Sequence, residues 1–200
     1  MSKKKLNLVI GLSIIFVILM VSVIFGWTEG FDTFVYESII SLRCDFLDKF
    51  FKFITDLGDT FFIVGLVVGV VLVLRNTVGY LYATLAVDTV ITNFIFKQLI
   101  RRDRPDVLKL IKQGGFSFPS GHSMISMSMY GMLIYLCYKK IKNKYIKWII
   151  CSLLGILILS IGLSRVYLGV HYISDVLGGF ILSFIMVVLY TELINKYLGE

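Results

Sequence analysis

The chain contains two histidines, and each stands beside residues that suit it to nucleophilic or acid–base chemistry. His171 is followed four residues later by Asp175, so the two side chains share one face if the segment is helical. A carboxylate that takes the proton of one ring nitrogen leaves the other free to attack or to accept a proton. Arg165, six residues before the histidine, offers a planar charged fork that suits an oxyanion. Alone, this segment is also typical of a His–Asp pair that closes a helix end.

The other histidine, His122, ends the segment Pro-Ser-Gly-His. Pro119 stops any earlier helix and Ser120 is a favourable N-cap, so we predict a helix that begins at Gly121. The free amides of Gly121 and His122 then point out of the helix N-terminus, where amides and helix dipole bind anions. His122 adds a titratable imidazole at the same place, so the segment predicts an anion site with its own acid or base.

Basic residues cluster before Pro105. Lys97, Arg101 and Arg104 are spaced i, i+4 and i+7, which predicts one cationic stripe along a helix. Pro105 disfavours the helical conformation at Arg104, so we expect the helix to end there. On its own, such a stripe is more typical of basic side chains that reach a membrane surface.

Together, the three segments resemble the signature of the type 2 phosphatidic acid phosphatase family, membrane lipid phosphatases related to the vanadium haloperoxidases. Lys-x6-Arg-Pro matches residues 97–105, Pro-Ser-Gly-His matches 119–122, and Ser-Arg-x5-His-x3-Asp matches 164–175. The resemblance covers about the C-terminal half of the chain. It extends to the compact bacterial members that dephosphorylate phosphatidylglycerol phosphate or undecaprenyl diphosphate.

The resemblance implies a role for each matching residue. His171 attacks phosphorus and becomes phosphohistidine, Asp175 orients it, and His122 protonates the leaving oxygen and later activates water. The implied phosphate cage consists of basic side chains, a hydroxyl and backbone amides: Lys97, Arg104, Arg165, Ser120, Gly121 and His122. Because these groups neutralise the phosphate, we expect no metal and no cofactor. The three cysteines have no metal-ligand spacing either.

The chain is more apolar than a soluble domain, with 58% hydrophobic residues and a mean hydropathy of +0.87. Its 200 residues suffice for one domain, residues 1–200, with five or six membrane spans. We predict an all-α integral membrane protein, whose helical core the resemblance implies to be that of the phosphatase and haloperoxidase family. Six uncharged or nearly uncharged segments are the predicted spans: 6–26, 58–74, 78–100, 121–138, 148–165 and 172–193.

Residues 30–57 mix apolar residues at helical spacing with charged ones, which predicts one or two amphipathic helices. They lie on the membrane surface or cover the bundle, and they either frame a lateral lipid entrance or only pack. Asp88 is a charge inside a predicted span, about 13 Å from Lys97 at helical rise. It is too distant to share a phosphate, so we expect a structural hydrogen bond or a protonated carboxyl.

The net charge of +7 raises the question of a nucleic-acid partner, which the distribution of the basic residues does not support. Three lysines lie in residues 3–5 and five in residues 139–147, so membrane lipids with anionic headgroups are the expected partners. With six spans, these segments share one side, which the positive-inside rule makes cytoplasmic. We therefore expect a multi-pass plasma-membrane protein with cytoplasmic termini and all three motifs at the outer face.

The sequence thus predicts a lipid phosphatase that acts on a lipid phosphate or diphosphate. Outer-face placement favours undecaprenyl diphosphate, while phosphatidylglycerol phosphate and phosphatidic acid stay open, as does the oligomeric state. One alternative is a vanadium haloperoxidase-like enzyme, which six membrane spans disfavour. Another is a phosphate-binding transporter or scaffold without turnover, which the presence of His171, Asp175 and His122 disfavours.

Overall fold

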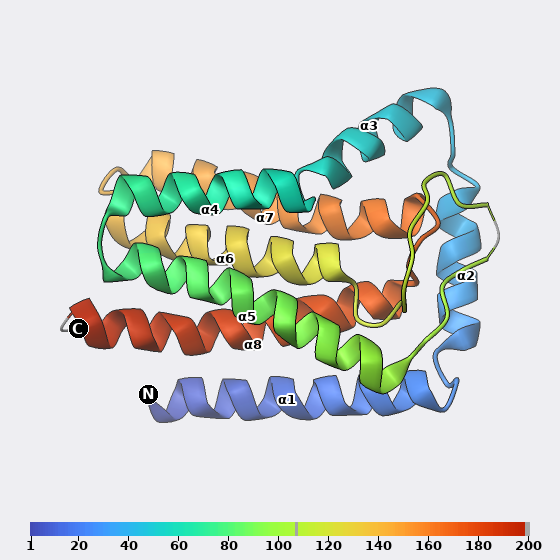
Figure 1. Cartoon of the computed structure of the whole chain (residues 1–200), viewed down its shortest axis with the longest axis horizontal. Coiled ribbons are helices and arrows are strands. Elements are labelled where there is room, and N and C mark those ends of the chain that lie inside the picture. Colours follow the sequence, from blue (N-terminus) through green and yellow to red (C-terminus); the bar gives the residue numbers. More distant parts are fainter. Residues whose placement is uncertain (107, 199–200) are drawn as a thin grey trace.

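The computed structural model describes residues 1–106 and 108–198, and the regular structure of this part of the chain is entirely α-helical. Six long helices run side by side (Figure 1): α1 (Lys3–Ile24), α4 (Thr60–Leu74), α5 (Thr77–Ile100), α6 (Gly121–Lys140), α7 (Lys144–Tyr167) and α8 (Ile173–Leu198). Two shorter helices, α2 (Glu29–Ile40) and α3 (Asp45–Asp56), connect α1 to α4. The predicted all-α fold is confirmed.

Four described helices are long and apolar enough to cross a membrane: α1, α5, α7 and α8. The fifteen-residue α4 reaches that length only with α3, from which it is bent by 45°. Helix α6 is less apolar because it carries buried serines, among them Ser123, Ser126 and Ser128. By length and composition, the described residues therefore hold four spans, or five with the bent pair, where the sequence predicts six.

Helix α6 is the centre of the bundle and packs against α5, α7 and α8. Its methionines Met124, Met129 and Met132 are fully buried, and flexible thioether side chains fill irregular gaps between helices well. The outside of the bundle is apolar instead of polar, as Ile18 on α1 and Leu159 on α7 illustrate with 60% and 63% exposure. Such an exterior suits a hydrocarbon environment.

The two ends of the bundle differ (Figure 1). The start of α1, the end of α8 and the α4–α5 and α6–α7 connections lie at one end. At the other end lie α2, which runs across the long helices, the loop that follows α5, and the α7–α8 turn. This second end therefore carries all three sequence motifs.

Helix α5 ends earlier than predicted, at Ile100. Arg101 adopts a left-handed conformation with φ of 50°, and its amide donates to the carbonyl of Lys97, which closes the helix C-terminus. Arg104 therefore lies in the following loop, and the predicted helical stripe of Lys97, Arg101 and Arg104 is wrong. In contrast, Asp88 accepts a hydrogen bond from the Tyr190 hydroxyl, as expected of a structural carboxyl.

Candidate active site

His171 lies in the turn before α8, and Asp175 lies in the first turn of that helix. The helix dipole favours an acidic residue there, and Oδ2 of Asp175 also accepts a 2.8 Å hydrogen bond from the Tyr172 amide. Nδ1 of His171 lies 3.4 Å from the same Oδ2. The predicted pair meets, but across the start of a helix rather than along one helix face, because α8 begins at Ile173.

Ser117, which the sequence motifs do not single out, completes this pair. Its hydroxyl donates to Oδ2 of Asp175 at 2.5 Å and lies 3.2 Å from Nδ1 of His171. On the far side of the ring, Nη1 of Arg104 lies 2.9 Å from Nε2. A guanidinium can only donate, so these partners assign the acceptor role to Nε2 and the proton to Nδ1. Nε2 therefore holds the lone pair that a nucleophile needs.

The environment of His171 keeps the imidazole neutral. Burial lowers the pKa of His171 to about 3, and although Asp175 raises it, Arg104 and Arg165 lower it further. The side chain is only 2% exposed. At neutral pH the ring is therefore neutral, with its one proton on Nδ1.

Backbone carbonyls hold two of the predicted phosphate-binding cations. Lys97 donates to carbonyls of residues 116–117, and Arg104 donates to carbonyls of residues 115–116 and of Val170. Within the described chain neither forms an ion pair with a carboxylate, so no acidic side chain occupies their donors. Burial lowers the pKa of Arg104, which still titrates far above neutral pH as arginines do. The side chains of Lys97 and Arg104 thus offer hydrogen-bond donors to an anion at this end of the bundle.

The third predicted phosphate-binding cation, Arg165, is only 1% exposed. Its amines donate to the hydroxyl of Thr55 at 2.6 Å and to the side-chain oxygen of Gln113 at 2.9 Å. Its Nε is buried without a hydrogen-bond partner in the described residues. An anion that replaced the Gln113 oxygen would gain a donor that the fold already holds in place.

The start of α6 agrees with the sequence prediction. Ser120 is the N-cap, and its hydroxyl accepts a hydrogen bond from the amide of Ser123. Gly121 and His122 line a cavity, while Ser120 is fully buried and uses its hydroxyl in the cap. No group among the described residues hydrogen-bonds the His122 ring, so its nitrogens are available to a ligand. Of the predicted cage residues, Ser120 and Arg165 thus lie behind the cavity lining.

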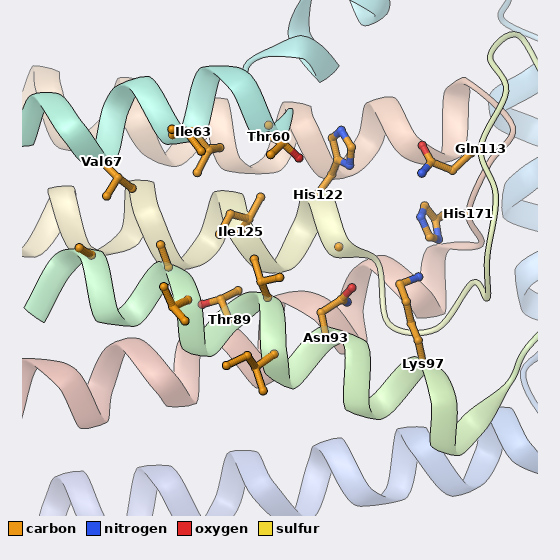
Figure 2. A pocket seen from close by; sticks show the side chains of 18 of the residues that line it. Thr60, Ile63, Val67, Thr89, Asn93, Lys97, Gln113, His122, Ile125 and His171 are labelled. Carbon is orange, nitrogen blue, oxygen red and sulfur yellow. The ribbon is translucent and has the colours of Figure 1, made fainter.

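This cavity has a volume of about 630 Å³ and lies between α4, α5 and α6 (Figure 2). One end is polar and carries the motif side chains: Lys97, Arg104, Gln113, His122 and His171. The remainder is mostly apolar and is lined from three helices: Ile63, Val64, Val67, Val68, Ala86, Val87, Val90, Ile91 and Ile125. In Figure 2 the two histidines and Lys97 lie at one end, and Val67 lies toward the other.

Glycines allow the motif segments to approach α8 closely. A Cβ on Gly178 would lie 2.5 Å from the ring of Phe118, and one on Gly179 would lie 2.9 Å from the Ser120 carbonyl. The segment that carries His122 therefore rests directly on the helix that carries Asp175. In residues 1–106 and 108–198, no group of three or more His, Cys, Asp and Glu side chains is arranged to hold a metal ion.

The helical bundle with this site defines a recognisable class of protein. The chain belongs to the PAP2 superfamily, whose family model matches residues 76–198. It is 31% identical to phosphatidylglycerophosphatase B of Bacillus subtilis (strain 168), across 94% of this chain and 97% of that protein. It is 29% identical to lipid A 4'-phosphatase of Porphyromonas gingivalis, across 54% of this chain and 47% of the relative.

Solved structures agree with this assignment. The crystal structure of a transmembrane PAP2 type phosphatidylglycerolphosphate phosphatase from Bacillus subtilis matches with a TM-score of 0.86 and 30% identity. That match covers 94% of this chain and 96% of the other. Aquifex aeolicus LpxE shares the fold, with a TM-score of 0.67, 20% identity, and coverage of 79% and 93%. The family expected from the three motifs is confirmed.

Proposed function

We propose that this chain is a membrane lipid phosphatase that hydrolyses a phosphomonoester or diphosphate headgroup. The observation that carries the proposal is the single cavity that joins two histidines and unpaired cations to a long apolar wall. A lipid phosphate has the same division into a charged head and an apolar tail. The names of the relatives, phosphatidylglycerophosphatase B and lipid A 4'-phosphatase, support this reaction class.

The reaction proceeds in two displacements. Nε2 of His171 forms a bond to phosphorus while the bond from phosphorus to the leaving oxygen breaks, and His122 gives that oxygen a proton. Water then attacks the phosphohistidine, His122 takes a proton from it, and inorganic phosphate leaves with the His171 ring restored. Asp175 stabilises the cationic ring between the two steps.

Charge stabilisation does most of the catalytic work in phosphoryl transfer. The phosphoryl oxygens are bound by the basic side chains of Lys97, Arg104 and Arg165 and by the start of α6 at Gly121. Ser120 acts as the cap of that helix start, since its buried hydroxyl already accepts hydrogen bonds from Ser123. The basic side chains supply the positive charge that a metal ion supplies in other phosphatases, so activity is expected to be independent of metal.

In the membrane, the single domain of residues 1–200 crosses six times, and α4 and α6 are spans because they run beside the other four. Helices α2 and α3 lie at the interface, where α3 exposes Phe46, Phe50 and Phe53. The termini are cytoplasmic and the site faces outward. The lysine-rich α6–α7 connection, at the end of the bundle away from the site, supports this orientation (Figure 1).

The lipid enters sideways between α4 and α5. Val64 on α4 and Val90 on α5 both line the cavity and are 56% and 62% exposed. The cavity therefore opens toward the region that acyl or prenyl chains occupy. Placement at the outer face favours undecaprenyl diphosphate, and the name of the 31% identical relative favours phosphatidylglycerol phosphate.

The test is phosphate release in detergent from undecaprenyl diphosphate, phosphatidylglycerol phosphate and phosphatidic acid, each in excess EDTA. We expect release from at least one lipid and none with His171→Ala. A rate that EDTA abolishes and magnesium restores would contradict metal independence. Phosphate binding without release would favour a scaffold, and halide oxidation by peroxide with vanadate would favour a haloperoxidase.

A further inference from the structure

A second layer of charged residues lies behind the His171–Asp175 pair. Asp32 on α2 is fully buried, although most of that helix is exposed. Its Oδ1 accepts from the Ser174 amide at 3.0 Å, and its Oδ2 accepts from the Ser174 hydroxyl at 2.6 Å. A residue far away in the sequence is thereby fixed to the first turn of α8.

Arg102 connects this carboxylate to the catalytic one. Its Nη2 donates to Oδ2 of Asp32 at 2.6 Å, and its Nη1 donates to Oδ1 of Asp175 at 2.7 Å. The guanidinium also lies 4.4 Å from the ring centre of Tyr172 and is only 12% exposed. Burial alone would lower the pKa of Arg102, but Asp175 and Asp32 raise it above its ordinary value.

Net stability is a weak explanation for this arrangement. Buried ion pairs often contribute little to folding, because desolvation of the charges offsets their attraction. Two carboxylates and one guanidinium leave one net negative charge, and it lies next to His171. When that ring becomes a cationic phosphohistidine, the net negative charge of the network balances its positive charge.

We propose that Asp32 and Arg102 are positioning residues for the His171–Asp175 pair, an inference that rests on the proposed function. Arg102 holds Oδ1 of Asp175, so that Oδ2 faces Nδ1 of His171. Asp32 neutralises Arg102, so that Asp175 keeps its charge for the histidine. Helix α2 thereby contributes to the position of the pair through one residue, because Asp32 binds the first turn of α8.

The first test separates turnover from substrate binding. Asp32→Asn keeps the shape and removes the charge, so kcat should fall about tenfold or more, as for lost outer-shell partners of other sites. KM for the lipid should change less than about twofold, because no phosphate contact is altered. Asp32→Glu should recover part of kcat. Glu37→Gln, on the exposed side of α2, is the matched control and should behave as wild type.

The second test is a double-mutant cycle. Asp32 acts through Asp175, so in an Asp175→Asn background Asp32→Asn should change kcat less than about twofold. If Asp32→Asn does not yield folded protein, Arg102→Lys carries the same cycle, because lysine cannot bridge two carboxylates as a fork. Equal losses in both backgrounds, or a change confined to KM, would overturn the positioning role.

The two proposals fail differently. Wild type that is inactive on every lipid would overturn the proposed phosphatase function, and this inference with it. If wild type is active but the effects of Asp32→Asn and Asp175→Asn on kcat are additive, only the role of Asp32 and Arg102 would be overturned.

Discussion

At the scale of single residues, the proposed chemistry depends on which nitrogen of His171 is free. Asp175 and Ser117 contact Nδ1, and Arg104 donates toward Nε2, so the neutral ring has its lone pair on the side away from the carboxylate. An incoming phosphate competes with the ring for the Arg104 donor. In the proposed mechanism, binding of the substrate therefore both supplies the electrophile and releases the nucleophile.

Substitution of the pair should separate attack from orientation. His171→Ala should abolish phosphate release, because nothing replaces the nucleophile. Asp175→Asn should leave a much slower enzyme, because an amide can hold the ring but does not stabilise its cationic form. Initial rates in detergent check both variants, and a near-wild-type rate for His171→Ala would refute the nucleophile.

The buried neutral histidine also predicts a pH dependence of stability. The pKa of His171 is about 3 when folded, against roughly 6.5 for an unperturbed histidine. Between these values only the unfolded chain takes up the proton, so this contribution is complete above the unfolded pKa and is lost as pH falls toward 3. The thermal midpoint in detergent should therefore drop more between pH 7 and pH 5 for wild type than for His171→Gln. Equal drops would contradict the assignment.

At the scale of helices, the α4–α5 side of the cavity should select for a long apolar chain. Ala86→Trp would fill the apolar part while the polar end stays intact. We expect kcat/KM for a long-chain lipid to fall about tenfold or more, with hydrolysis of p-nitrophenyl phosphate unchanged. Ile156→Trp on the exposed face of α7 is the control. Equal losses on both substrates would argue against a tail site.

Local sequence patterns predict most of the helices, whereas they do not predict contacts between residues that are distant in the sequence. The Pro-Ser-Gly-His segment predicted the start of α6 at Gly121, because an N-cap is a local interaction. Sequence patterns predict the end of α5 four residues too late, at Arg104, since the left-handed Arg101 has no strong signature in the sequence. Ser117 and Asp32 were missed for another reason: only the folded chain brings them to Asp175. The motif histidines and cations were predicted from spacing, and their roles stay predictions.

At the scale of the whole molecule, the bundle has a lysine-rich end and an end that carries the three motifs (Figure 1). Long helices that alternate in direction bring the end of α5, the start of α6 and the α7–α8 turn to one surface. The same alternation brings the α6–α7 connection to the other. One orientation in the membrane therefore decides which substrate pool the site can reach.

Sidedness can be measured with single cysteines in a background without Cys44, Cys137 and Cys151. A membrane-impermeant thiol reagent should label Lys112→Cys in intact cells and spare Asn143→Cys, because the basic loop is expected inside. Both positions should react after permeabilisation. The reverse pattern would put the site in the cytoplasm and favour a lipid biosynthetic intermediate over a recycled wall-carrier lipid.

The most direct test of the whole account is to trap the phosphorylated enzyme. His122→Gln removes the base that activates water, and p-nitrophenyl phosphate has a leaving group that departs without an acid. This variant should therefore accumulate a phosphate on Nε2 of His171 that is stable in alkali and lost in acid, visible by mass spectrometry of the His171 peptide. Phosphate on another residue, or full turnover by a His171→Ala variant, would contradict the account.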